Sequence, residues 1–197
     1  MLSNTCKIQN GTMDLNEILK ESERVASCCG FNEKQTLQLR LLCEEMDGML
    51  PNIIDEFYGD FWIEVEDGTC KINASIYFAE FTAQKKKELI NVSKSKTNAN
   101  AKGIVGKIRS IIEDLFLDSS NMQACDMAGM FNFATEQSVG IVSSFMWSLR
   151  QYKNAVKKKE ESDWDELEKS IIASLADDVI VGVKGKQANI VIIKNFK

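Results

Sequence analysis

Apolar and polar residues repeat along this chain with two different periods, and these periods predict its secondary structure. In the first quarter, apolar residues recur every three to four positions, as they do on one face of a helix. The repeat predicts helices over 14–29 and from residue 33 to about 50, capped by Asp14 and Asn32. Pro51 is expected to kink or close the second helix, because proline has no amide hydrogen to donate.

A period of two residues predicts strands. Residues 61–65 and 70–78 alternate apolar and polar side chains on either side of Asp67-Gly68, a pair that favours a hairpin turn. Further strands are predicted over 5–9, 178–184 and 188–194. Helical periodicity returns after the first hairpin and predicts helices at 83–92, 104–116, 139–152 and 163–176.

The order of these elements predicts the fold class. Helices and a hairpin, followed by more helices and a second hairpin, are typical of an α+β two-layer sandwich. We expect a mixed or antiparallel sheet with helices on one face. The length of 197 residues suits a single domain, and the apolar share of 44% is enough for a hydrophobic core.

The charge and the cysteine pattern exclude several classes of function. The net charge of −5 does not favour nucleic acid or an anionic membrane as a partner. The chain has six cysteines, none in a CxxC pair, and no histidine. This excludes a Cys/His zinc site and every histidine-activated nucleophile. Because the sequence has no signal-peptide pattern and no apolar stretch of membrane-spanning length, we expect a cytoplasmic protein.

The stretch LRLLCEEMDGML, residues 39–50, places two adjacent carboxylates inside a segment that otherwise reads as a buried helix. Adjacent helical residues lie about 100° apart, so at most one of Glu44 and Glu45 can point fully inward. A buried Glu45 would suit a general base, because burial disfavours the charged carboxylate. The alternative is purely structural, with one glutamate exposed and the other partly shielded.

The segment around this pair resembles a known family. GFNEKQTLQLRLLCEE, followed by a strand pair with an EDG turn, resembles the anti-sigma-factor serine kinases of bacteria, which have the histidine-kinase-type (GHKL) ATPase fold. In that family a helical glutamate is the base, and an asparagine four residues later holds magnesium beside the nucleotide phosphates. The resemblance implies that Glu45, or else Glu44, is the base. The asparagine position is then Met49 or Gly48, and Asp47 is the nearby carboxylate that could replace it.

Two further parts of the nucleotide site are implied by the same resemblance. AKGIVGKIRSIIEDLF, residues 101–116, is similar to the family's glycine-containing phosphate loop and the helix after it. Gly103 and Gly106 would offer backbone amides, and Lys102 or Lys107 positive charge. Taken alone, the phrase is more often an ordinary helix start. Where the family has an aspartate–glycine loop that reads adenine, this chain has SIYFAEFTAQ, with Glu80 and no glycine.

The resemblance covers residues 12–78 and the closing segment DWDELEKSIIASLADDVIVGVKGKQANIVIIK. It implies one ATPase-like domain over 1–197, with a helical insertion at about 118–160. It also implies ATP with magnesium as cofactor, a sigma-factor or anti-sigma-antagonist type of protein partner, and a homodimer by analogy. If active, the protein would be an ATP-dependent serine kinase or ATPase, but the lost asparagine and aspartate–glycine loop argue against activity. The second hypothesis is a non-catalytic interaction scaffold that binds no nucleotide.

Overall fold

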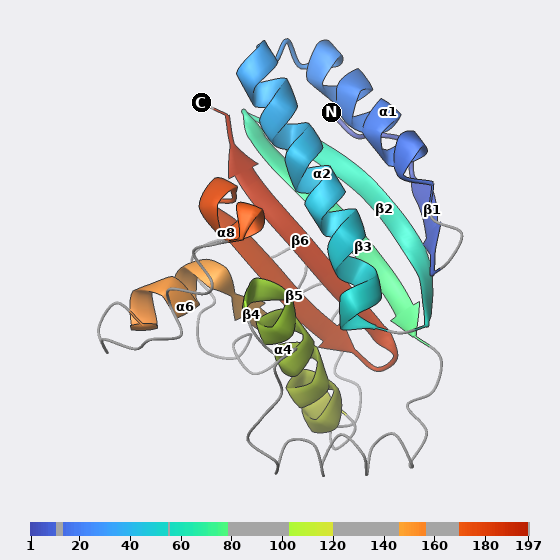
Figure 1. Ribbon diagram of the computed structural model, residues 1–197, viewed down its shortest axis with the longest axis vertical. Coiled ribbons are helices and arrows are strands. Elements are labelled where there is room, and N and C mark those ends of the chain that lie inside the picture. Colours follow the sequence, from blue (N-terminus) through green and yellow to red (C-terminus); the bar gives the residue numbers. More distant parts are fainter. Residues whose placement is uncertain (11–13, 55, 79–102, 120–145, 157–169, 197) are drawn as a thin grey trace.

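A computed structural model describes residues 1–10, 14–54, 56–78, 103–119, 146–156 and 170–196 of the chain. These residues form an α+β fold in which helices lie on one face of a six-stranded sheet (Figure 1). Every strand pairing in the sheet is antiparallel. The predicted fold class is therefore confirmed at the level of an α+β sandwich with an antiparallel sheet.

The sheet joins the two predicted hairpins side by side. Its strands are β1 (Cys6–Gln9), β2 (Phe57–Glu66), β3 (Thr69–Phe78), β4 (Met146–Ser148), β5 (Asp178–Lys184) and β6 (Gln187–Asn195). Their spatial order is β1-β2-β3-β6-β5-β4, so β6 lies between β3 and β5 in the middle of the sheet. The strands predicted at 5–9, 178–184 and 188–194 are confirmed to within a residue or two.

The first two helices begin where the predicted caps place them. They are α1 (Leu15–Cys28), α2 (Glu33–Ile53), α4 (Gly103–Ser119), α6 (Leu149–Val156) and α8 (Ile171–Leu175). The Asp14 carboxylate accepts a hydrogen bond from the amide of Asn16. Asn32 and Gln35 form a reciprocal capping box at the start of α2. Helix α2 continues two residues beyond Pro51, because the amide of Ile54 still bonds the carbonyl of Leu50 at 3.1 Å.

The helix predicted over 139–152 is wrong at residues 146–148 and confirmed at residues 149–152. Residues 146–148 form the edge strand β4, and the helix begins only at Leu149. The reason is a contact with a distant strand: the Asp178 carboxylate accepts hydrogen bonds from the Ser148 hydroxyl and the Arg150 amide, both at 2.9 Å. These bonds end the strand and cap α6. Residues 139–145, the helix predicted at 83–92 and residues 163–169 lie outside the described residues.

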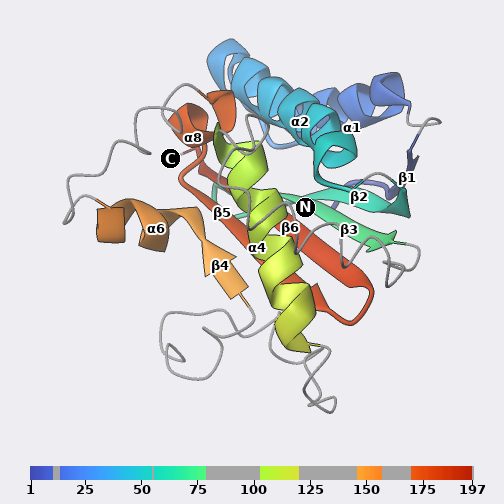
Figure 2. The ribbon, with the colours of Figure 1, turned by 60° about the horizontal axis from the view of Figure 1, so that its bottom comes forward.

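Helix α2 crosses the middle of the sheet and fixes the geometry of the candidate site. Its buried face packs on the sheet through Leu39, Leu42, Met46 and Leu50, all fully buried. Helix α1 packs along one side of α2, and α4 and α8 contact it from the other side (Figures 1 and 2). One edge of α2 therefore faces α1, and the other edge faces α4 and α8.

Candidate functional site

The three acidic side chains of the candidate site lie on two different edges of α2. Glu44 and Asp47 follow Arg40 by one and two helical turns, so the three residues share one edge. The Arg40 guanidinium binds Glu23 of α1 at 2.8 Å and Glu44 at 3.2 Å. This edge therefore faces α1. Glu45 lies on the opposite edge, so the helix does not bring the two groups of carboxylates together.

Glu44 belongs to a surface ion-pair chain and not to a cleft. Its side chain is about one third exposed and shares Arg40 with Glu23. Partly exposed ion pairs of this kind contribute little to stability. Glu44 and Glu45 are both partly buried, and the ion pair with Arg40 places the Glu44 carboxylate on the α1 edge.

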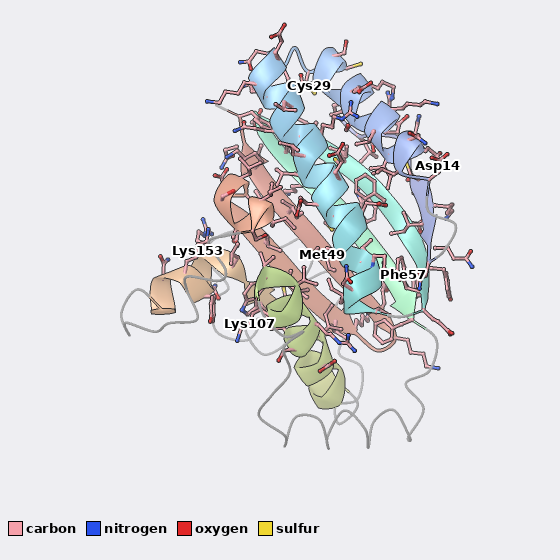
Figure 3. The ribbon with its side chains drawn as sticks, in the orientation of Figure 1. Asp14, Cys29, Met49, Phe57, Lys107 and Lys153 are labelled. Atoms are coloured by element: carbon pink, nitrogen blue, oxygen red, sulfur yellow. The ribbon has the colours of Figure 1, made fainter. Side chains whose placement is uncertain are left out.

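Glu45 and Met49 lie one turn apart on the edge of α2 that faces α4 and α8. Glu45 is half-buried, and among the described residues no hydrogen bond or ion pair involves its carboxylate. Met49 is only 2% exposed, and Figure 3 labels it on the side of α2 towards α4. Met49 follows Glu45 by four positions, the spacing at which the resemblance predicts an asparagine if Glu45 is the base. This edge offers one carboxylate and one buried apolar side chain.

Asp47, on the α1 edge, is partly buried. Its Oδ1 atom is buried and has no hydrogen-bond partner in the part of the chain that the structure describes. Burial raises the pKa of this carboxyl above its ordinary value. Because Asp47 lies on the α1 edge, its carboxylate is on the other side of α2 from Glu45 and Met49. Gly48 is exposed on the outer surface of α2 and lines no cleft.

Asp47→Asn is expected to raise the free energy of unfolding at neutral pH by about 1 kcal/mol, because it removes a buried, unpaired charge. The folded-state pKa of Asp47 is raised above its ordinary value of 3.8. The cost of the charge is therefore absent below that value and grows as the pH rises through the folded-state pKa. Urea unfolding from about pH 4 to about pH 7 measures the difference between variant and wild type.

The control for this prediction is Glu44→Gln on the same edge. Glu44 is paired with Arg40 at 3.2 Å and partly exposed. Its replacement should change stability by no more than about 0.5 kcal/mol, in the destabilising direction. A difference between Asp47→Asn and wild type that stays constant with pH would contradict the assignment.

The glycine-rich segment forms the N-terminal end of α4. Gly103 is the first residue of the helix and has a φ of 81°, a conformation that favours glycine. Gly106 is buried within the first turns. In both ribbon views this end of α4 lies nearer to α2 and α8 than the other end does (Figures 1 and 2). The free amides of the helix start therefore lie on the Glu45 side of α2.

Lys107 does not point its charge towards α2. Its ammonium lies 4.9 Å from the ring centroid of Tyr152 in α6, a cation–π contact. The Tyr152 ring in turn lies 6.0 Å from that of Trp147 in β4. Sequence patterns gave no sign of this cluster, because Lys107 and Tyr152 are 45 positions apart. It links α6 to α4 through the Lys107 ammonium, which lies over the Tyr152 ring.

Two of the predicted site residues, Glu80 and Lys102, lie outside the described residues. Within the described ranges no group of three or more Cys, Asp or Glu side chains is arranged to hold a metal ion. The donor set on the α4 edge of α2 also does not fit the magnesium of the family, because the asparagine oxygen is replaced by the buried thioether of Met49.

Comparisons with known proteins identify no family for this chain. No family model, no curated protein and no solved structure matches the chain. Across the described residues, no helix has both the length and the apolar character needed to cross a bilayer.

Proposed function

We propose that this chain is a regulatory protein of the anti-sigma-factor type that acts by binding a protein partner, and that it binds ATP or a related nucleotide weakly and without magnesium. The proposal keeps the GHKL-like fold as its starting point. We propose that the protein binds a nucleotide but does not transfer phosphate. The reason is that α2 has no counterpart of the asparagine that holds magnesium in the anti-sigma-factor kinases.

One observation carries the proposal. The glycine-led start of α4 lies on the same side of α2 as Glu45 and Met49. A helix N-terminus with free amides favours a phosphate group. Phosphate bound there would approach Glu45, and with no metal ion between them the two negative charges would repel each other. Weak binding follows from this arrangement.

ATP at roughly five times its Kd is expected to stabilise the protein by about 1 kcal/mol, which raises the Tm by about 2–4 °C for a chain of this size. Magnesium should not increase the shift. Glu45→Gln should tighten binding by roughly fivefold, since one charge repulsion at about 4 Å in water is worth about 1 kcal/mol. Thermal unfolding with ATP, in EDTA or in magnesium, measures these shifts.

The matched control is Glu44→Gln, which removes the adjacent carboxylate on the α1 edge and should leave the ATP shift unchanged. An identical shift in wild type and both variants would mean that the nucleotide binds away from the α2–α4 edge. A shift that requires magnesium would contradict binding without metal. No shift in wild type would favour the alternative, an interaction scaffold that binds no nucleotide. The buried Met49 also fits that alternative, because its thioether does not suit magnesium.

A further inference from the structure

Three sulfur-bearing residues gather at the C-terminal end of α1. Cys28 is the last residue of the helix, and Cys29 follows it as the C-cap, where Figure 3 labels it. The Cys29 Sγ atom lies 3.6 Å from the Sδ atom of Met1. Both cysteines are free thiols; Cys28 is exposed, Cys29 is partly exposed and Met1 is 43% exposed. Solvent therefore reaches all three residues.

The other described cysteines do not offer the same chemistry. Cys6, Cys43 and Cys70 are at most 1% exposed and lie in the hydrophobic core. Burial raises the pKa of Cys6 to about 11 and the pKa of Cys70 to about 12, so both remain protonated at neutral pH. A buried, protonated thiol is not a metal ligand. Among the described residues, an ion in solvent can therefore reach the thiols of the Cys28–Cys29 pair.

Two different parts of the fold hold this cluster in place. The Cys29 amide bonds the carbonyl of Val25 at 2.9 Å, and Gly30 ends the helix with a φ of 68°. Met1 lies beside Val65 of β2, whose amide bonds the Met1 carbonyl at 2.8 Å. The thiol and the thioether are 28 positions apart in the sequence. Tertiary structure therefore brings them together, and the site is largely formed before any ligand binds.

We propose that Cys28, Cys29 and Met1 form a binding site for copper(I), with two thiolates and one thioether as ligands. Thiolate and thioether sulfurs select copper(I), whereas magnesium and calcium take oxygen ligands. Zinc sites in proteins use thiolate, imidazole and carboxylate ligands, so the thioether makes this set a poor one for zinc. Each thiol that binds the ion releases one proton to solvent. No electron is transferred, because copper enters and stays in the +1 state.

The separation of the two sulfur atoms fits a single ion. Metal–sulfur bonds in proteins are about 2.3 Å long, and two such bonds span 3.6 Å when they meet at an angle of about 100°. This bent arrangement leaves room for a third ligand. Cys28 supplies it, because its side chain is exposed and can rotate about χ1 towards its neighbour Cys29. Since the sulfurs are exposed, the bound ion is open to exchange with thiols of other molecules.

The test is a competition for copper(I) between the reduced full chain and bicinchoninate, a chromogenic copper(I) chelator, without oxygen. Wild type should withdraw one copper(I) per chain. Cys28→Ser and Cys29→Ser should each raise the Kd at least about hundredfold, because groups that merely orient a metal ligand are already worth about 10–100-fold. Cys43→Ala is the matched control: Cys43 is 0% exposed, so loss of its thiol should leave the Kd unchanged.

X-ray absorption at the copper edge tests the role of Met1, since it counts the sulfur atoms around the ion. Three should surround copper in wild type. Far-UV circular dichroism and the unfolding midpoint establish that each variant is folded. A wild type that takes no copper from the chelator, or an equal loss of binding in Cys43→Ala, would overturn the proposal. Unchanged binding in Cys28→Ser or Cys29→Ser, or a copper centre with only two sulfur neighbours, would do the same.

Discussion

Gly59→Ala is expected to lower the free energy of unfolding by at least about 3 kcal/mol, or to prevent folding altogether. Gly59 lies on β2, buried between Ile8 of β1 and Ile76 of β3. A Cβ atom at this position would lie 2.0 Å from the backbone oxygen of Ser75 and 2.9 Å from the Cα of Ile76. Backbone atoms in the centre of a sheet cannot move aside as a flexible side chain can. Urea unfolding, or the soluble yield if folding fails, measures the effect.

Gly48→Ala is the control for this substitution and should act in the opposite direction. Gly48 is exposed within α2, and a Cβ atom there would meet nothing within 4 Å. Alanine is favoured over glycine inside a helix by about 0.5–1 kcal/mol. Equal effects of alanine at the two positions would contradict the packing described for β2 and β3.

Met49→Asn should destabilise the fold by about 2–4 kcal/mol. Met49 is 2% exposed, so the substitution removes apolar packing and buries an amide with no partner. It also introduces an asparagine four residues after Glu45, the spacing that the resemblance to the anti-sigma-factor kinases implies for a magnesium ligand, and it therefore tests the proposal of binding without metal. Chemical unfolding gives the stability, and thermal unfolding with ATP and magnesium gives the ligand response.

Met49→Leu is the matched variant, because it keeps the volume and the apolar character and should cost less than about 1.5 kcal/mol. If Met49→Asn were as stable as wild type and gained a magnesium-dependent ATP shift, the α4 edge of α2 would still hold a metal pocket. That result would overturn the conclusion that the donor set no longer fits magnesium.

The parts of the fold that depend on neighbouring residues were predictable from the sequence. Asp14 and Asn32 cap their helices through bonds that reach two or three residues along the chain. The Asp67-Gly68 turn sets the register between β2 and β3 in the same local way. Strand β4 was not predictable, because it is defined by pairing with residues 180–182, more than 30 positions away.

The same distinction between local and long-range contacts applies to the candidate site. Helical periodicity alone implies that Glu44 and Glu45 point in different directions, and the Arg40 ion pairs show which of them faces α1. The sequence could not show that Asp47 has a buried, unpaired oxygen, since that depends on how α1 packs against α2. Nor could it show that Lys107 is bound to Tyr152 of a helix formed much later in the chain.

The place of β6 in the sheet has a consequence for synthesis on the ribosome. Among the described strands β6 is the last to emerge, yet it joins β3 on one side to β5 on the other. Until it emerges, no strand pairs with both β3 and β5. The edges of β3 and β5 that later bind β6 therefore expose unpaired backbone groups. Such edges invite wrong pairing between nascent chains. Pairing of β6 with both β3 and β5 therefore completes the sheet, and before it the two parts are held together mainly through the contacts of α2 with α4 and α8.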